Sequence, residues 1–229
     1  MTNLSEFVVV VANESHVTYA QQICDEMESS AKARGTGIAK RKPEYVAKKM
    51  EEGKAVIALH PDGKWAGFCY IETWGHGKYV ANSGLIVSPD LRKSGLARQI
   101  KQRVFELSRT KYPDAKIFGL TTALAVMKIN SSLGYKPVTY SELTDDEEFW
   151  KGCQSCVNFE ILTAKNRSNC LCTAMLFDPA QATDFVPLPV VEQKQAPKSS
   201  PLQERWRRYR QHLAVQPVAL ANQGEKQAS

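Results

Sequence analysis

Residues 83–97 of this 229-residue chain read SGLIVSPDLRKSGLA, and this stretch decides the fold. An apolar run ends at Pro89, and residues 92–97 then lead into a segment with helical spacing. A strand that feeds a glycine-containing loop at a helix N-terminus exposes backbone N–H groups at the positive end of the helix dipole. Gly95 lets the backbone approach a ligand closely, and the small Ala97 leaves room for it. We therefore expect a phosphate-binding loop, the alternative being a structural turn with exposed basic residues.

The apolar patterning on both sides of this stretch predicts an α/β fold. Strands are expected over residues 7–11, 55–59, 65–73, 79–87, 117–120, 136–140 and 173–177. Helices are expected over residues 17–33 and 44–50, from about residue 97 onward, and over residues 123–132. On the helix after Ala97 the apolar stripe is expected to face the core, with Lys101 on another face.

Three regions are expected along the chain. Residues 1–142 form the core, residues 143–178 hold a cysteine-rich insertion and the last strand, and residues 179–229 form a tail rich in Pro and Gln. Most of this tail lacks the apolar residues needed to order itself. Residues 202–213 have helical potential, which leaves open a solvated tail or a helix that docks onto a partner.

Charge and composition suit an ordinary globular protein. The chain is 43% hydrophobic and carries a net charge of +6, about half of it in the tail, so the folded part is only mildly basic. That balance favours an anionic small ligand over nucleic acid. No apolar run approaches the roughly 20 residues that span a bilayer, and the N-terminus does not resemble a signal peptide, so we expect a cytoplasmic protein without a membrane contact. A homodimer stays open.

The loop, the order of the elements and the ending Leu133-Gly134-Tyr135 together resemble the GNAT acyltransferases, over about residues 7–140. The resemblance implies a central, mixed and twisted sheet flanked by helices, in the order β-α-α-β-β-β-α-β-α-β, followed here by the insertion and a final strand. It also implies acetyl-CoA or another acyl-CoA as co-substrate. The residues that would hold CoA are Leu85 and Val87 through their main chain, Arg92, Lys93, Ser94, Gly95, Leu96 and Ala97 in the loop, and Asn130, where many members carry a tyrosine acid.

A second resemblance concerns the acceptor. Residues 37–42 (GIAKRK), 120–122 (LTT) and 134–138 (GYKPV) are similar to segments of the acyltransferase domain of bacterial N-acetylglutamate synthases. The resemblance implies that Arg41 and Lys78 bind the carboxylates of a small amino acid, with glutamate and arginine biosynthesis as the specific prediction. That family has an arginine after its Leu-Thr-Thr, where this chain has Ala123, so one carboxylate contact is unassigned. Alternatively, Arg41 simply lies in a basic helix entrance.

Transfer of an acyl group to an amine needs a base for the amine and a proton for the leaving thiolate. Glu72, near a strand end, and His76, between two glycines, are the candidate catalytic residues, with an ordinary surface carboxylate and a turn residue as the alternatives. Two other functions stay open: a protein or peptide N-acetyltransferase, and a non-catalytic acyl-CoA-binding adaptor.

Four cysteines in two close pairs, Cys153 with Cys156 and Cys170 with Cys172, predict a structural zinc site. Four thiolates satisfy tetrahedral zinc and leave no open position for catalysis. The alternatives are free buried cysteines, a redox switch and an iron–sulfur cluster.

Overall fold

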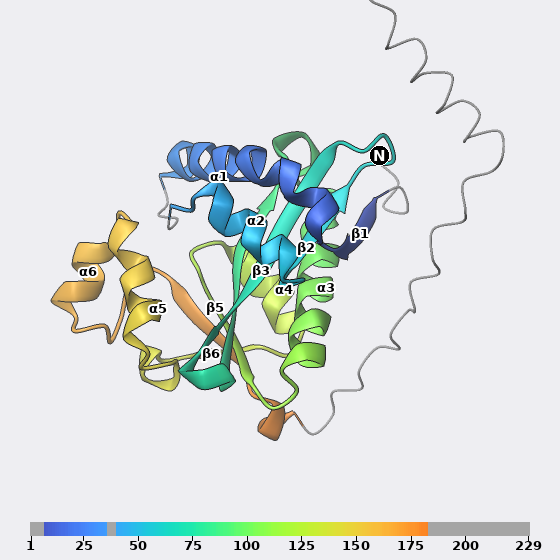
Figure 1. Cartoon of the computed structure of the whole chain (residues 1–229). Coiled ribbons are helices and arrows are strands. Elements are labelled where there is room, and N and C mark those ends of the chain that lie inside the picture. The colour runs from blue at the N-terminus through green and yellow to red at the C-terminus, as the bar shows by residue number, and fades with distance from the viewer. Residues whose placement is uncertain (1–6, 36–39, 183–229) are drawn as a thin grey trace, which may run out of the picture. The chain divides into compact units, whose positions relative to one another are not determined.

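The computed structural model describes residues 7–35 and 40–182 (Figure 1). The chain divides into two compact units, Met1–Val186 and Pro187–Ser229, and all of the described residues belong to the first. The expected helix at 202–213 and residues 37–39 of the GIAKRK segment lie outside the described residues.

Seven strands of the described residues form one sheet in the order β1-β2-β3-β4-β5-β7-β6. Each neighbouring pair is antiparallel except β4 and β5, which are parallel. The strands are β1 (Val8–Val11), β2 (Ala55–Leu59), β3 (Trp65–Trp74), β4 (Tyr79–Val87), β5 (Lys116–Thr121), β6 (Lys136–Val138) and β7 (Thr173–Phe177). The parallel pair of β4 and β5 needs a crossover connection, and the helix α3 (Leu96–Lys111) between them in sequence supplies it.

Helices cover both faces of the sheet (Figure 1). On one face lie α1 (Ala20–Arg34) and α2 (Pro43–Glu51), and on the other lie α3 (Leu96–Lys111) and α4 (Leu124–Ser132). Alternation along β3 separates the two cores, because Tyr70 packs with the α1–α2 core while Cys69 and Ile71 pack with the α3 core. Ring and aliphatic side chains fill both sides, so the sheet is buried on both faces.

The expected α/β class, mixed sheet and order of elements are confirmed. The first helix begins later than expected, because a capping box at Asn13 starts a 3₁₀ helix, Glu14–Tyr19, before α1. The strand expected over residues 136–140 ends at Val138, since Tyr140 turns into a 3₁₀ helix and donates its hydroxyl to the Cys172 carbonyl at 2.8 Å.

The expected outward position of Lys101 is wrong. Its side chain is 2% exposed and lies between α3 and the sheet, because Asn82 of β4 offers a hydrogen-bond acceptor inside the core. Helical spacing marks which residues share a face, but an amine that finds a partner can join the buried face.

The insertion between β6 and β7 contains α5 (Glu147–Lys151) and α6 (Phe159–Ala164). It packs on the sheet through an apolar cluster that includes Leu143, Trp150 and Leu162. Trp150 stacks on Tyr140 with ring centroids 5.9 Å apart. Among residues 7–35 and 40–182, no helix has the length and apolar character that a membrane crossing requires.

Candidate active site

The loop between β4 and α3 presents backbone donors at the start of α3. Among the described residues, no acceptor is within hydrogen-bond reach of the N–H groups of Lys93, Ser94, Gly95 and Ala97. Gly95 is the N-cap of the helix with φ of 92°, a left-handed conformation that glycine adopts without strain. Unpaired N–H groups at a helix N-terminus suit a phosphate group, as the sequence predicts.

The two basic side chains of this loop differ in their surroundings. Arg92 turns toward α1, with Nη2 2.9 Å from Glu26 Oε1 and a further hydrogen bond to Ser30. Lys93 is exposed and forms no ion pair within the described part of the chain. Arg92 therefore anchors the loop to α1. Of the two basic side chains, Lys93 is the one available to contact an anionic ligand.

β4 and β5 separate after Ala81, well before β4 reaches the loop. They pair only over Tyr79–Ala81 and Lys116–Phe118, while β4 continues to Val87. The opposite edge of β5 pairs with β7 over Ile117–Thr121. We call the unpaired edge of β4 over residues 82–87 the strand gap. It contains Leu85 and Val87, whose main chain is predicted to hold an extended ligand arm, and it ends at the phosphate-binding loop.

On the α1–α2 face lies a polar group that we call the acceptor-side cluster: Arg41, Tyr45, Lys49, Tyr70 and Glu72. The Glu72 side chain is 9% exposed, accepts a hydrogen bond from the Tyr45 hydroxyl, and lies 3.9 Å from Arg41 Nη2. Arg41 Nε donates to the Tyr70 hydroxyl at 2.6 Å. The cluster thus brings the predicted catalytic Glu72 and the predicted substrate-binding Arg41 together.

Burial changes the acidity of this cluster. Burial and the Glu72 carboxylate raise the pKa of Tyr45 well above its usual range, so the phenol stays protonated as a donor. Burial lowers the pKa of Lys49, whose Nζ lies 4.9 Å from the Tyr45 ring centroid. Cationic and carboxylate groups in one partly buried place can orient an amino acid and take a proton from its amine.

A β-bulge connects the strand gap to this cluster. The β3–β4 register shifts between Phe68 and Tyr70, and Gly84 has φ of 65°. A Cβ on Gly84 would lie 2.4 Å from Tyr70 Cε1, so the absence of a side chain lets the Tyr70 ring lie against the backbone of β4. The ring then holds Arg41 through its hydroxyl.

His76 and Lys78 lie apart from this cluster. Both are exposed in or beside the turn Gly75–Gly77 that joins β3 to β4, at the end of β4 away from the phosphate-binding loop. His76 has φ of 55° and belongs to the turn itself. This placement separates them from Glu72 and Arg41, and the roles of all four residues in catalysis and carboxylate binding stay predictions.

Asn130 is 1% exposed on α4, and its buried Oδ1 has no hydrogen-bond partner in the described part of the chain. Its Nδ2 makes a weak contact with Met175 Sδ at 3.7 Å. Gly119 of β5 faces it, since a Cβ on that glycine would lie 4.0 Å from Asn130 Nδ2. An unpartnered buried amide next to the strand gap is consistent with the predicted ligand contact.

The four cysteines of the insertion lie near one another without forming the predicted zinc site. In residues 7–35 and 40–182, no three His, Cys, Asp or Glu side chains are grouped so as to hold a metal ion. The thiols are directed to local partners instead: Cys156 Sγ accepts from the Asn158 N–H at 3.4 Å, and Cys170 Sγ lies 3.7 Å from the Asn158 carbonyl oxygen. Zinc is therefore not supported, nor is a cluster that needs the same four ligands.

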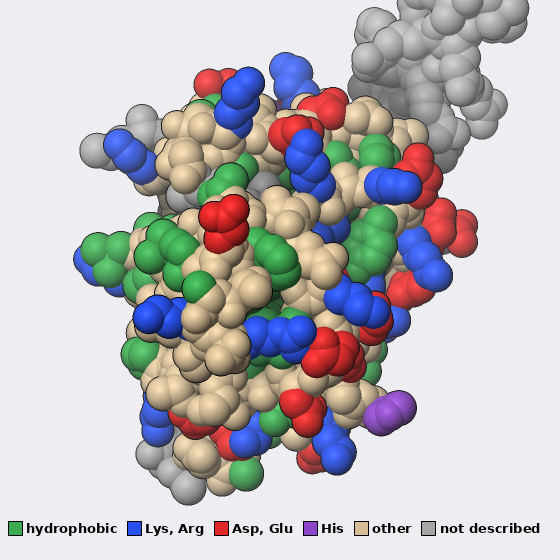
Figure 2. All heavy atoms as spheres, turned by 90° about the vertical axis from the view of Figure 1, so that its left-hand side faces the viewer, with side chains coloured by type: hydrophobic (Ala, Val, Ile, Leu, Met, Phe, Trp, Pro, Cys, Tyr) green, Lys and Arg blue, Asp and Glu red, His purple; other side chains and the backbone are tan. Residues whose placement is uncertain are grey.

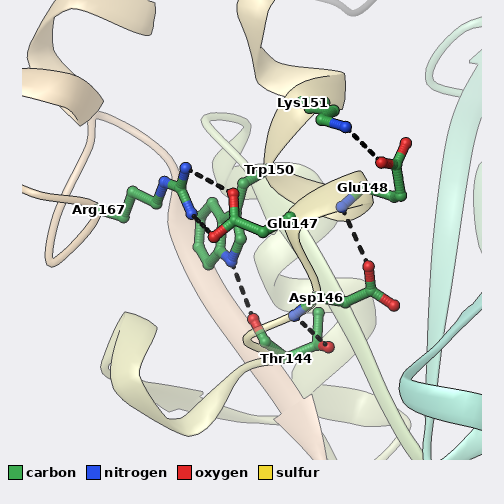
Figure 3. Close-up of polar contacts among 7 residues, drawn as sticks. All are labelled: Thr144, Asp146, Glu147, Glu148, Trp150, Lys151 and Arg167. Carbon is green, nitrogen blue, oxygen red and sulfur yellow. Dashed lines mark hydrogen bonds and ion pairs between the residues drawn. The ribbon is translucent and has the colours of Figure 1, made fainter.

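Polar contacts within the insertion order α5 and the loop before it (Figure 3), and further hydrogen bonds join the insertion to the core. Asp146 caps α5 by accepting from the Glu148 N–H at 3.0 Å, and also accepts from the Gly75 N–H at 3.1 Å. Trp150 Nε1 donates to the Thr144 carbonyl at 3.0 Å. Ser155 accepts from the Lys40 N–H at 3.2 Å, which places the insertion beside the chain segment that carries Arg41.

Figure 2 shows the face of the molecule on the side where α5 and α6 lie in Figure 1. Basic and acidic side chains are interspersed on it, with hydrophobic side chains between them. In the insertion, Val157, Ile161 and Leu171 are large apolar residues that remain exposed.

Sequence reasoning missed Tyr45 and Tyr70 as parts of the site. Tyr45 lies in the first turn of α2 and Tyr70 in the middle of β3, where an aromatic residue is ordinarily assigned to the core. The available signal was the alternation that puts Tyr70 and Glu72 on one face of β3. No sequence pattern places Tyr45 opposite them.

The sheet order, the single parallel pair, the strand gap and the loop at α3 together match the GNAT fold. Comparison with solved structures agrees, while no protein-family model and no curated protein sequence matches the chain. N-acetylglutamate synthase from Neisseria gonorrhoeae, complexed with coenzyme A and N-acetyl-glutamate, has a TM-score of 0.53 at 14% identity. That match covers 75% of this chain and 35% of the synthase, so the chain spans about a third of the synthase's length.

Two further structures match over nearly their whole length. Rv2747 from Mycobacterium tuberculosis, in complex with CoA and NLQ, has a TM-score of 0.52 at 18% identity, covering 75% of this chain and 98% of that one. The acetyltransferase yncA from Salmonella typhimurium, solved with acetyl-CoA, has a TM-score of 0.51 at 13% identity, with 83% and 99% covered. At these identities the likeness establishes the fold.

Proposed function

We propose that this protein is an acyl-CoA-dependent N-acyltransferase whose acceptor is the α-amine of a small amino acid, with glutamate as the specific candidate. One observation carries the proposal. The strand gap runs from a loop with unpartnered N–H groups to a bulge that contacts the Arg41–Glu72 cluster. The structural neighbours solved with CoA or acetyl-CoA support an acyl-CoA as the co-substrate.

In this proposal, residues on one face of the sheet bind CoA and residues on the other face bind the acceptor. On the α3 face, the loop N–H groups and Lys93 would hold the diphosphate, and the unpaired main chain of β4 would bind the arm. The thioester supplies an activated acyl carbon. On the α1–α2 face, Arg41 would bind a carboxylate of the acceptor and Glu72 would take the proton that the attacking amine releases.

The insertion favours a small acceptor over a protein. It reaches the segment before Arg41 through the Ser155 hydroxyl, and Cys153 is close enough to Arg41 for the guanidinium to offset part of the rise that burial causes in the pKa of the thiol. A covered acceptor side restricts access to an extended polypeptide, whereas an amino acid needs only a small opening.

The acceptor is tested by replacing Arg41 with Lys, with Lys40→Met as the control. The Arg41→Lys variant keeps the charge but loses the planar fork. We expect the KM for the amino-acid acceptor to rise about 10-fold or more, the value of one charged hydrogen bond, while kcat changes less. Lys40 pairs with Glu28 in an exposed bridge, so its replacement should leave KM unchanged. An unaltered KM in the Arg41 variant would exclude its role in acceptor binding.

A further inference from the structure

Lys101 is a buried amine that the proposed reaction does not use. Its Nζ lies 3.3 Å from Asn82 Oδ1 and 5.3 Å from the centroid of the Tyr135 ring. Within the described residues it has no carboxylate partner, and the nearby Cys69 thiol, whose pKa burial raises to about 11, is protonated and supplies no negative charge. Burial lowers the pKa of Lys101, because its charged form is costly without a counter-ion, and an anionic ligand beside it would stabilise the ammonium.

The side chains around Lys101 leave some of its hydrogen-bond donors without an acceptor. Asn82 Oδ1 already accepts a second hydrogen bond, from the Tyr135 hydroxyl at 2.9 Å, and Asn82 Nδ2 donates to Ser108 Oγ at 2.9 Å. Ser108 in turn donates to the Val104 carbonyl at 2.7 Å. An ammonium has three N–H donors, and Asn82 accepts a hydrogen bond from one of them. The network therefore fixes the position of the Lys101 amine and leaves its other donors available to a ligand.

This amine lies at the closed end of the strand gap. Asn82 is the first residue of β4 beyond its ladder with β5, and Gly119 is the first residue of β5 beyond the same ladder. A Cβ on Gly119 would lie 3.7 Å from the Asn82 carbonyl oxygen and 4.0 Å from the amide of Asn130. The buried Asn130 Oδ1 without a partner lies at the same end.

The length of the strand gap sets how far an extended arm can reach from the loop. Five residues of β4 separate Asn82 from Val87, or about 17 Å at the usual rise of a strand. A CoA molecule with its diphosphate at residues 92–97 and its arm along the strand gap would bring the acyl end toward Asn82. The α3 face, which carries Lys101, is also the face of the loop.

We propose that Lys101, oriented by Asn82, binds a carboxylate at the far end of the acyl group, so that the donor is a dicarboxylic acyl thioester of three or four carbons. This rests on the proposed function, because it places the acyl end of CoA in the strand gap. Such a carboxylate gives the buried ammonium its counter-ion and accepts its remaining protons. An acetyl group would leave that charge unpaired.

Two unreactive CoA thioethers test this by calorimetric binding: S-(3-carboxypropyl)-CoA and the nearly isosteric S-(3-carbamoylpropyl)-CoA. We expect the wild-type protein to bind the carboxylate form at least about 10-fold more tightly. In Lys101→Met the two affinities should become equal. Lys111→Met, an exposed residue on the same helix, is the control and should keep the wild-type preference.

The outcomes are distinguishable. Equal affinity of the wild-type protein for the two thioethers, with CoA itself bound, overturns the proposal and keeps the acyltransferase. Failure to bind CoA at all removes the proposed function and this proposal with it. The wild-type ratio decides the matter even where Lys101→Met does not fold.

Discussion

Replacing Gly84 with alanine should destabilise the protein through two separable effects. The residue has φ of 65°, where a Cβ costs about 1–2 kcal/mol. The new methyl would also lie 2.4 Å from Tyr70 Cε1 and 2.9 Å from Met27 Cε. Tyr70 is 1% exposed and its hydroxyl is held by Arg41, so the ring cannot move aside easily. Overpacking of this kind costs about 1–3 kcal/mol.

Gly63 supplies a matched control, since it has φ of 84° with no atom within 4 Å of the position of a Cβ. The Gly63→Ala variant should therefore show only the backbone cost. For a unit of this size, about 1 kcal/mol lowers Tm by roughly 2–4 °C. We expect Tm to fall by about 2–8 °C for Gly63→Ala and further, by about 4–20 °C, for Gly84→Ala.

The assay is urea unfolding followed by intrinsic fluorescence, with thermal unfolding as a second measurement. Equal losses of unfolding free energy in the two alanine variants would refute the close packing of Tyr70 on the bulge. It would also weaken the link between the strand gap and the acceptor-side cluster. A variant Tyr70→Leu should relieve the penalty of Gly84→Ala, because it removes the ring atoms that the methyl meets.

Three further predictions concern the loop, the insertion and the thiols. Gly95→Glu should abolish CoA binding in calorimetry, because it puts an anion and a strained residue into the loop that is predicted to bind phosphate. Retained affinity for CoA would refute the prediction that this loop binds it. Asp146→Ala should lower the free energy of unfolding in urea by about 1–2 kcal/mol, because two backbone N–H groups lose their acceptor. Glu147→Ala, which breaks an exposed ion pair, should leave the free energy of unfolding nearly unchanged. Equal effects of the two substitutions would contradict this prediction. Burial and neighbouring thiols raise the pKa of Cys153 to about 11 and of Cys172 to about 12. Both thiols should therefore react slowly with iodoacetamide at pH 8 and faster as the pH rises. Fast alkylation of either cysteine at pH 8, measured by peptide mapping, would refute this prediction.

Much of the fold could be predicted from the sequence because its strands and helices have clear periodicity. The nearly continuous apolar run of β3 and the apolar run before Pro89 are local signals, and the loop at Gly95 marks where a strand gives way to a helix. The order of elements then leaves few arrangements. The start of α1 was harder, because the capping box at Asn13 begins a 3₁₀ helix whose residues also fit a helical pattern.

The insertion was misjudged because its cysteines dominated the interpretation. Trp150 and Leu162 provide apolar contacts that hold α5 and α6 on the sheet, so the segment has a core of its own. Spacing in the sequence brings thiols near one another, but tetrahedral coordination needs their directions as well. Those directions depend on the backbone around Asn158, which contacts two of the sulfur atoms.

Within the site, the loop could be predicted and the partners across the sheet could not. Glu72 was identified on its strand, but the Tyr45 hydroxyl that bonds it comes from a helix 27 residues away in sequence. Lys101 was assigned to an outer face, since charged residues rarely enter a core. Its burial follows from Asn82, 19 residues earlier, and a partner at that separation leaves no local signature.

The most direct test of the central claim is a mass-spectrometric search for product. The purified full-length chain is incubated with acetyl-CoA or succinyl-CoA, with and without isotopically labelled L-glutamate. The account predicts an N-acylated, labelled glutamate that is lost in Gly95→Glu. Absence of any acylated product from glutamate or from a panel of other amino acids, by a protein that is folded, would contradict it.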